Sequence, residues 1–409
     1  MRRAFFFSVV VLAACNGAYG AEPPGQTPAD AQAPDATTPD AATDAPEPCA
    51  LDCAHGHRQC TASGCTLVCD TGFADCDGDP SNGCERNLQL DGAACGVCAH
   101  DCLGGACAAG QCQPVKVLTE KDGLRGLALD GSGVYMVVPG TPGRIQRCPL
   151  VGACTPFVVA SSLDQPDQLA VGATNVYVTG AAALTTGKVW RCGKAGCGAQ
   201  AEVMTSAVPL AQAIAVDAVN VYFASRTGNG DFVKRCSLSG CGPGEPALVG
   251  SGFSIVDAIA TDGANVWVSE QKDIARCPVG GCAGAPPKYA AGFTSASQII
   301  VDGGEVFWAD QAFAGSNGAV LRCSAATCVQ PAVLAAPIDL PDGWLALDAT
   351  SVYVPSRQAL LRVPRAGGPA KTMAQLTGLR VRGIAVGPQA VYLTTGDGAA
   401  AGTLLRVAK

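Results

Sequence analysis

A nine-residue block recurs seven times in the C-terminal three quarters of the chain, and this repetition limits the possible folds more than any other feature. Each copy holds a mostly apolar triplet, an aspartate or glycine, three further residues, then a valine and an aromatic residue. The pattern predicts two strands joined by a tight turn. The copies begin at Leu127, Leu169, Ile214, Ile259, Ile299, Leu345 and Ile384, which spaces them 39–46 residues apart.

Each block is followed by an apolar stretch that ends in an arginine and predicts a third strand. These repeat arginines are Arg147, Arg191, Arg235, Arg276, Arg322, Arg362 and Arg406. We expect them to brace neighbouring strands, with the block aspartates as partners. In five copies a cysteine pair then precedes a fourth apolar stretch, and we expect a disulfide to close this turn. The pairs are Cys148/Cys154, Cys192/Cys197, Cys236/Cys241, Cys277/Cys282 and Cys323/Cys328. Four short strands per repeat is the size of a β-propeller blade.

The strand count predicts how the array ends. The seventh copy stops at Lys409 after its third strand, whereas residues 114–118 form an apolar stretch that belongs to no earlier copy. A strand there can complete the last blade and remove the exposed edges of an open array. We therefore expect an all-β chain: a closed seven-bladed β-propeller of four-stranded blades over residues 114–409, whose N-terminal strand completes the last blade, preceded by a small disulfide-rich module.

One copy is similar to a known repeat motif. Val306-Phe307-Trp308-Ala309-Asp310 approaches the YWTD motif, and the repeats resemble those of YWTD and NHL-type propellers. The resemblance is one of architecture, and it implies a binding role by analogy.

The N-terminus predicts export. Arg2 and Arg3 precede an apolar run too short to span a bilayer, as in a signal peptide. The run ends in Leu12-Ala13-Ala14-Cys15, which resembles the lipobox of bacterial lipoproteins. That resemblance implies a signal peptide over residues 1–14 and an acylated (palmitate-carrying) Cys15 that anchors the chain in a lipid bilayer, at the outer membrane or cell surface. The alternative is an ordinary cleaved signal with a chance cysteine. Residues 15–48, rich in Pro, Ala, Asp and Thr, predict a disordered tether.

Residues 49–113 predict a disulfide-rich module. Twelve cysteines lie in this segment, and large apolar side chains are nearly absent, so covalent links must replace a core. Beyond Cys15 the chain has 22 cysteines, twelve here and ten in the repeats, and both counts are even, as complete pairing requires. The alternative is zinc, with Cys95 and Cys98 beside the histidines His55, His57 and His100 as ligands. An oxidising compartment favours disulfides.

The module contains one candidate metal site. Asp75, Asp77, Asp79 and Glu85 place oxygen ligands at spacings that suit a hard cation, so calcium is the candidate cofactor. The segment resembles the start of an EF-hand-type loop but departs from it, because Pro80 replaces the turn glycine and Arg86 occupies the bidentate position. The alternative is a series of Asx and glycine turns.

Strand geometry predicts where a ligand would bind. The loops between second and third strands and those between blades share one face, and they carry the variable residues. The residues that enter each inner strand there are Arg125, Asp167, Gln212, Asp257, Ser297, Asp342 and Arg382. They are the candidate ligand-binding ring around a central channel, for an unknown protein or glycan; the alternative is a solvated funnel. Arg125 and Arg382 belong to blades that adjoin on closure, so together they can hold a carboxylate.

Two classes of function follow. The first is a membrane-anchored surface lipoprotein whose propeller binds a ligand or protein. The alternative is an extracytoplasmic propeller enzyme with a carboxylate or metal site, lactonase-like or lyase-like. Residues 114–409 contain no histidine, which excludes a Ser-His-Asp triad there. The net charge of −7 argues against nucleic acid as a partner.

Overall fold

The structure is a computed structural model that describes residues 52–61, 64–183, 186–206, 208–227, 230–242, 244–311, 318–340, 343–396 and 401–409. The signal peptide and tether predicted over residues 1–48, with Cys15, lie outside these ranges, as does Asp342. The chain divides into two compact units: Met1–Cys102 with Ala106–Gln111, and Leu103–Gly105 with Cys112–Lys409. Every regular element in the described ranges is a β-strand, and no helix there is long and apolar enough to cross a membrane.

The first unit is built from short strands. Three of them form one antiparallel sheet: β1 (Asp52–Cys53), β2 (Gly56–Thr61) and β3 (Gly64–Cys69). Two strand pairs follow: β4 (Phe73–Ala74) with β5 (Arg86–Asn87), and β6 (Cys107–Ala108) with β7 (Gln111–Cys112). The buried apolar residues of this unit are Cys53, Cys84, Ala94, Cys95, Cys102 and Cys107. Cysteines therefore occupy the interior that aliphatic side chains fill in ordinary domains.

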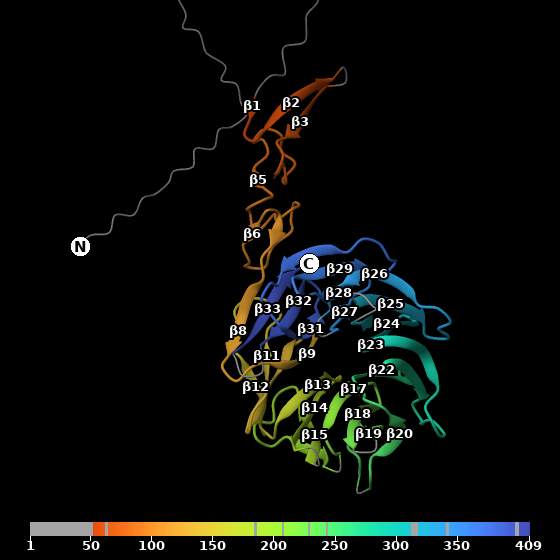
Figure 1. Ribbon diagram of the computed structural model, residues 1–409. Helices are drawn as coiled ribbons and strands as arrows, with labels where there is room; N and C mark the ends of the chain where they lie inside the picture. Colours follow the sequence, from red (N-terminus) through yellow and green to blue (C-terminus); the bar gives the residue numbers. More distant parts are fainter. Residues whose placement is uncertain are drawn as a thin grey trace, which may run out of the picture. The chain divides into compact units, whose positions relative to one another are not determined.

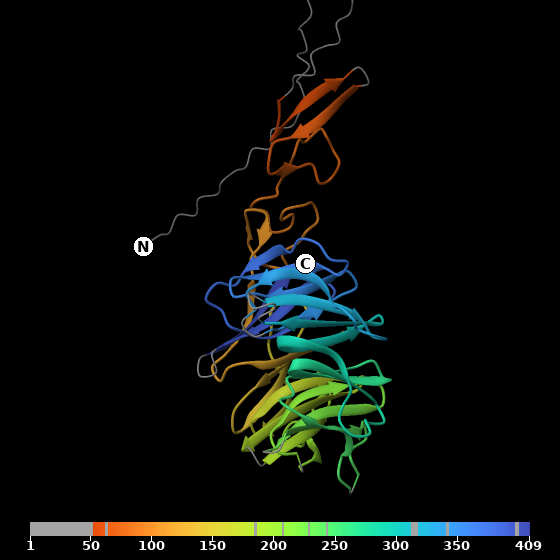
Figure 2. The same cartoon turned by 45° about the vertical axis from the view of Figure 1, so that its right-hand side comes forward.

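The second unit is a succession of antiparallel sheets that follow the repeats (Figure 1). The first repeat forms β9 (Arg125–Asp130), β10 (Gly133–Val138), β11 (Gly143–Cys148) and β12 (Phe157–Leu163). The second forms β13 (Pro166–Val171), β14 (Asn175–Ala183), β15 (Thr186–Gly193) and β16 (Glu202–Thr205). The third forms β17 (Ala211–Val216), β18 (Asn220–Thr227), β19 (Gly230–Ser237) and β20 (Ala247–Phe253). The sheets of the second and third repeats lie side by side in both ribbon views (Figure 2).

The fourth and fifth repeats share one six-stranded sheet, which corrects the expectation of separate four-stranded blades. Its strands are β21 (Ala258–Thr261), β22 (Asn265–Pro278), β23 (Lys288–Asp302), β24 (Glu305–Asp310), β25 (Gly318–Ser324) and β26 (Ala332–Ile338). Two strands are long. β22 covers the second and third predicted strands of the fourth repeat, with a positive φ of 56° at Gln271, and β23 runs from the fourth repeat into the fifth. The backbone of β23 also turns, at Gly292 with a φ of 89°, and the two halves of each long strand pair mainly with different neighbours.

The last repeats bring in the N-terminal strand. The sixth forms β27 (Ala346–Leu347), β28 (Ser351–Pro355), β29 (Ala359–Pro364) and β30 (Lys371–Gln375). The seventh forms β31 (Val381–Val386), β32 (Ala390–Thr395) and β33 (Gly402–Ala408). The outer partner of β33 is β8 (Val115–Glu120), which pairs antiparallel with it from Gly402↔Glu120 to Arg406↔Val115 (Figure 1).

The valine–aromatic pair of each block supplies the core. Adjacent residues of a strand point to opposite faces of the sheet, so the valine packs toward one neighbouring repeat and the aromatic ring toward the other. Seven buried clusters result, six of them between successive repeats. The remaining cluster joins Val134 and Met136 of the first repeat to Tyr392 and Leu404 of the seventh. The block aromatics are at most 2% exposed: Tyr135, Tyr177, Tyr222, Trp267, Phe307, Tyr353 and Tyr392.

Polar contacts also link the repeats. The block aspartates accept hydrogen bonds from turn amides, as at Asp217, which receives the amides of Val219 and Asn220 at 2.7 Å each. Most repeat arginines donate across to a backbone carbonyl, whereas aspartate partners had been expected. The pairs are Arg147 to Lys194, Arg191 to Leu238, Arg276 to Ala325, Arg322 to Arg365 and Arg406 to Gly152. The last pair runs from the seventh repeat to the first.

Five disulfides close the turns between third and fourth strands; we call these the cystine turns. They join Cys148 to Cys154, Cys192 to Cys197, Cys236 to Cys241, Cys277 to Cys282 and Cys323 to Cys328. Two of them also dock on the preceding repeat, since the amides of Cys197 and Cys282 donate to the carbonyls of Val159 and Val249, each at 2.8 Å. A cystine turn thus covers part of an outer strand that would otherwise be an open edge.

Candidate functional site

A cavity of about 340 Å³ lies among the innermost strands of the second unit. We call it the inner-strand pocket. All seven repeats contribute one to four residues to its wall, at or just before the first residue of the block. Its polar and aromatic lining residues are Asp167, Gln168, Gln212, Asp257, Gln298 and Trp344, and its apolar lining includes Leu127, Leu169, Ile214, Ile259 and Ile384. The volume falls in the range of small-ligand sites.

Three residues of the expected ring line this pocket: Asp167, Gln212 and Asp257. Asp167 is held at the rim by Arg125, whose Nη1 lies 2.9 Å from the carboxylate. The backbone carbonyl of Gln212 accepts the hydroxyl of Thr179 at 2.7 Å, a bond that ties the third repeat to the second. The structure thus brings three of the seven predicted ring residues together in one cavity.

Asp257 is the carboxylate with the most perturbed surroundings in the pocket. Desolvation by the surrounding wall raises its pKa above the ordinary value, although the backbone amide of Gln271 donates to the carboxylate and Arg226 attracts it. Arg226 is itself engaged by Asp231, whose carboxylate oxygens lie 3.2 Å from the guanidinium. No ion pair to Asp257 is found within the described residues, so its charge is only partly offset.

The other expected ring residues lie elsewhere. The hydroxyl of Ser297 donates to the carbonyls of Gly343 and Ala309, at 3.0 and 3.3 Å, and so joins the fifth repeat to the sixth. Nε of Arg382 donates to the carbonyl of Gly396 at 2.9 Å. Neither Arg125 nor Arg382 lines the pocket, and Asp342 is outside the described residues.

Sequence reasoning missed Gln168, Gln298 and Trp344, which do line the pocket. Each stands immediately before its block, whereas Asp167, Gln212 and Asp257 stand two positions before theirs and also line the pocket. The positions that face the pocket therefore differ from repeat to repeat. A tryptophan directly before the sixth block was the available signal.

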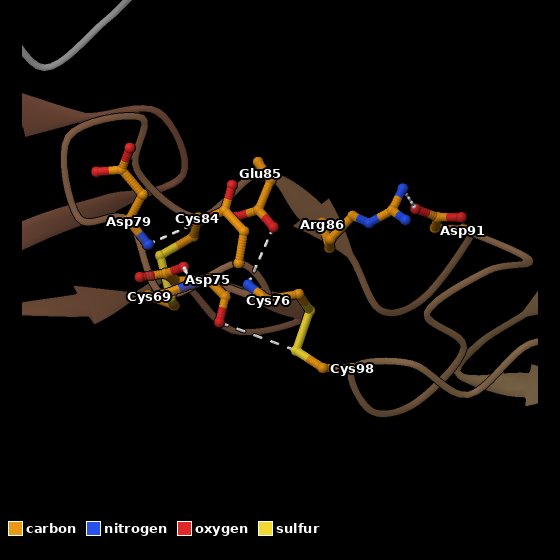
Figure 3. Close-up of a disulfide and its surroundings, with 11 residues drawn as sticks. Cys69, Asp75, Cys76, Asp79, Cys84, Glu85, Arg86, Asp91 and Cys98 are labelled. Carbon is orange, nitrogen blue, oxygen red and sulfur yellow. Dashed lines mark hydrogen bonds and ion pairs between the residues drawn. A yellow bond between two sulfur atoms is a disulfide. The ribbon is translucent and has the colours of Figure 1, made fainter.

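The first unit holds a cluster of carboxylates in the loop between β4 and β5 (Figure 3). Oxygens of Asp75, Asp77 and Glu85 lie within 4.8 Å of one another. Asp79 is not part of this cluster, and its carboxylate accepts the amide of Ser81 at 2.9 Å. Arg86, at the position of a bidentate ligand in the resembling motif, is paired with Asp91 at 2.7 Å and is directed away from the cluster (Figure 3).

The loop oxygens differ in how well they are satisfied. Asp75 accepts the amide of Gly78 at 2.7 Å, and Glu85 Oε1 accepts that of Cys76 at 3.0 Å. Hydrogen bonds from the amide of Asp79 and the side chain of Asn82 lower the pKa of Asp77. Glu85 Oε2 and Asn82 Oδ1 are buried and have no hydrogen-bond partner within the described residues. A bound cation would satisfy such oxygens, so the donor set fits calcium in part.

Disulfides occupy the cysteines on which the zinc alternative depended. Cys95 is bonded to Cys107, and Cys98 to Cys76 (Figure 3). A third bridge joins Cys69 to Cys84. A disulfide sulfur cannot act as a thiolate ligand, so Cys95 and Cys98 do not form a zinc site. Disulfides in both units indicate an extracytoplasmic protein.

No protein-family model matches the sequence, and no curated protein is significantly similar to it. Solved structures are similar in fold. The WD40 β-propeller domain of Doa1 superimposes with a TM-score of 0.52 at 9% identity, covering 71% of this chain and 96% of that domain. A chain of a nidogen/laminin complex gives a TM-score of 0.40 at 14% identity, covering 50% of this chain and 76% of the other. With the sheets described above, the Doa1 likeness establishes a β-propeller fold for the repeats.

Proposed function

We propose that the repeats form a closed seven-bladed propeller. Support comes from three contacts between the ends of the repeat array. β8 pairs with β33, Tyr392 packs in one cluster with Val134, and Arg406 donates to the carbonyl of Gly152 at 3.1 Å. A ring of this kind has no unpaired terminal blade.

We further propose that this propeller is a binding module displayed outside the cytoplasm. The observation that carries the proposal is the inner-strand pocket, because all seven repeats supply its wall and the lining differs from repeat to repeat. Structural positions are uniform from repeat to repeat, as the block aromatics are, whereas Gln168, Asp257 and Trp344 occupy comparable places with different chemistry. Variable side chains on a rigid scaffold are typical of recognition.

The binding proposal is tested by screening the full-length chain on glycan and surface-protein arrays, then comparing two variants. Trp344→Ala with Gln298→Ala removes pocket surface, and we expect binding to fall at least tenfold with little change in melting temperature. Asp217→Asn, in a turn of the repeats outside the pocket, should lower the melting temperature and leave affinity unchanged. A ligand that is indifferent to the pocket variant and lost in the turn variant would contradict the proposal.

The anchor is proposed on the sequence, through Cys15. Acyl chains contribute about 0.8 kcal/mol per buried CH₂, so two or three of them hold a protein firmly on a bilayer. Cys15→Ala should abolish labelling with radioactive palmitate and release the chain from membranes. Persistent labelling of the variant would contradict lipidation of Cys15. The enzyme alternative has no comparable observation in its favour: the carboxylate cluster of the described residues belongs to the first unit, whereas the pocket belongs to the second.

A second candidate function is calcium binding in the first unit, favoured by the buried, unpartnered Glu85 Oε2 beside Asp75 and Asp77. Calorimetric titration of the full chain with calcium should show one site that Asp77→Asn weakens at least tenfold. Asp70→Asn is the matched control, because Asp70 belongs to the same unit but not to the cluster. Equal affinity in wild type and Asp77→Asn would leave only turn hydrogen bonds as the role of this loop.

A further inference from the structure

We propose that the inner-strand pocket recognises an alkylammonium group, supplied either by a lysine side chain of a partner protein or by a free aliphatic amine. The inference rests on the proposed binding function and names the chemistry of its ligand. It reverses the sign expected from the sequence, which had Arg125 and Arg382 holding a carboxylate.

The charged side chains of the pocket favour a cationic ligand. Two carboxylates, Asp167 and Asp257, face the pocket, and no lysine, arginine or histidine belongs to its described lining. Arg125 offsets Asp167 from the rim at 2.9 Å. Asp257 has no ion-pair partner within the described residues, since Arg226 is taken up by Asp231. The pocket is therefore net negative, and a cation offsets that charge.

The neutral polar and aromatic side chains of the pocket favour an ammonium group. The side-chain amides of Gln168, Gln212 and Gln298 form no hydrogen bond with other described residues, so their carbonyls are available as acceptors. An ammonium group has three N–H donors and no acceptor, which matches one carboxylate and several amide carbonyls. Trp344 adds an aromatic ring to the same wall, and indole is the best ring for attracting a cation.

Other ligand classes fit the lining less well. A calcium ion takes six to eight oxygens and usually several carboxylates, whereas two carboxylates line this pocket and Arg125 already pairs with one. A free carboxylate would be repelled by Asp257. A neutral sugar can bond the amides but leaves the carboxylate charge uncompensated. The cavity of about 340 Å³ also leaves room for an alkyl chain against Leu169 and Ile259.

The experiment is a calorimetric titration of the full-length chain at low salt with four probes: 1,5-diaminopentane, its neutral analogue 1,5-pentanediol, a lysine-containing peptide, and the same peptide with norleucine in place of lysine. We expect an amine to bind and Asp257→Asn to weaken it at least tenfold. Trp344→Leu should also weaken amine binding, and this variant replaces Asp257→Asn in the test if Asp257→Asn fails to fold. The matched control is Asp339→Asn, which removes an exposed carboxylate paired with Arg357 at 2.8 Å outside the pocket and should change nothing.

The probes separate the two sources of the ammonium group. Tight binding of the diamine indicates a free amine, whereas preference for the lysine peptide over both diamine and norleucine peptide indicates a protein partner. The inference is overturned if 1,5-pentanediol binds as well as the diamine, if Asp257→Asn binds as wild type, or if no amine binds. In these cases the pocket is still a binding site if a different ligand binds more weakly to the double variant Trp344→Ala with Gln298→Ala. If the double variant binds that ligand as well as wild type does, the proposed binding function is also wrong.

Discussion

The two units of this chain use cysteine for opposite purposes. In the first unit, cysteines and Ala94 are the buried apolar residues that the structure describes, so the disulfides take the place of a core. In the second unit, seven clusters of mainly aliphatic and aromatic side chains form the core, and each cystine turn only adds a cysteine to one of them. Abundant cysteine in a sequence thus does not by itself say what holds a domain together.

Loop length separates the two uses further. The bridges of the first unit that link Cys69, Cys76 and Cys95 to their partners span 12–22 residues, against 5–6 residues for the cystine turns. The chain-entropy model gives about 3 kcal/mol for the longer loops and about 2 kcal/mol for the shorter ones. Each of these three disulfides thus contributes more to the free energy of unfolding in the first unit, which buries the least apolar surface, than a cystine turn does in the second.

Reduction should have the largest effect, and an unequal one. With excess thiol reductant, we expect the first unit to unfold completely and the second to stay folded at 25 °C with a lower melting temperature. Amide hydrogen exchange read by mass spectrometry reports both units in one sample. Protection should vanish for residues 64–102 and persist for β10, β14 and β18. Equal loss in both units would mean that the cystine turns, and not the core clusters, hold the repeats.

Removal of the N-terminal strand should have the next largest effect. Deleting residues 115–119 takes away the partner of β33 and leaves the seventh repeat with an exposed edge, so we expect aggregation or a large fall in melting temperature. Deleting residues 29–44, of similar composition to the rest of the tether, should do neither. If the two deletions behave alike, the proposed closure of the ring is wrong.

Much of the second unit could be predicted from the sequence, because its signals are local. Hydrophobic alternation identified the strands, and the block aspartates were correctly expected in the turns, as Asp217 illustrates. The fused sheet of the fourth and fifth repeats could not be predicted, since nothing in residues 288–302 tells a bent strand from two strands and a loop.

The site was harder to predict for two physical reasons. The repeats do not use the same positions for the pocket wall: Asp167, two residues before its block, lines the pocket, whereas Ser297 at the same position bonds to Gly343 and Gln298 lines the pocket instead. The repeat arginines donate to backbone carbonyls such as those of Lys194 and Leu238, and every residue has a carbonyl. Because a backbone carbonyl is the same in every residue type, the sequence does not indicate which residue accepts the arginine.

A single aromatic residue sharpens the question of closure. Tyr392 is 2% exposed and packs with Val134 and Met136, so Tyr392→Ala should cost about 3–5 kcal/mol of unfolding free energy, as for other large core truncations. Tyr135→Ala, the equivalent change between the first and second repeats, is the matched control. Urea denaturation should give similar losses for both. A much smaller loss for Tyr392→Ala would place it on an open edge.

The smallest effect concerns the sixth and seventh repeats, which have no cystine turn. There a basic residue three positions after the repeat arginine reaches back to the aspartate of the preceding block: Arg365 to Asp302 at 2.6 Å, and Lys409 to Asp348 at 2.8 Å. Lys194 of the second repeat makes the same contact with Asp130 although that repeat has a cystine turn, so these ion pairs join successive repeats whether or not a disulfide shapes the turn. Asp302 is half-exposed, and Lys409 and Asp348 are partly exposed, so each pair should contribute modestly, at about 1 kcal/mol.

Asp348 shows how pH tests this contribution. Burial alone would raise the pKa of its carboxyl, but hydrogen bonds from Lys409, Thr350 and Tyr353 outweigh that effect and hold the pKa below its usual range. Because the folded pKa is lowered, the carboxylate stabilises the fold fully above the unfolded pKa of about 3.9, and the stabilisation declines as pH falls from that value through the folded pKa. Asp348→Asn should therefore cost about 1–2 kcal/mol at pH 7 and progressively less as the pH is lowered below about 4. Asp262→Asn is the control: Asp262 accepts two turn amides but has no cation partner within the described residues, so its loss should be smaller. Equal losses, measured by urea denaturation across this pH range, would show that the turn amides and not the cross-repeat ion pair account for the stabilisation.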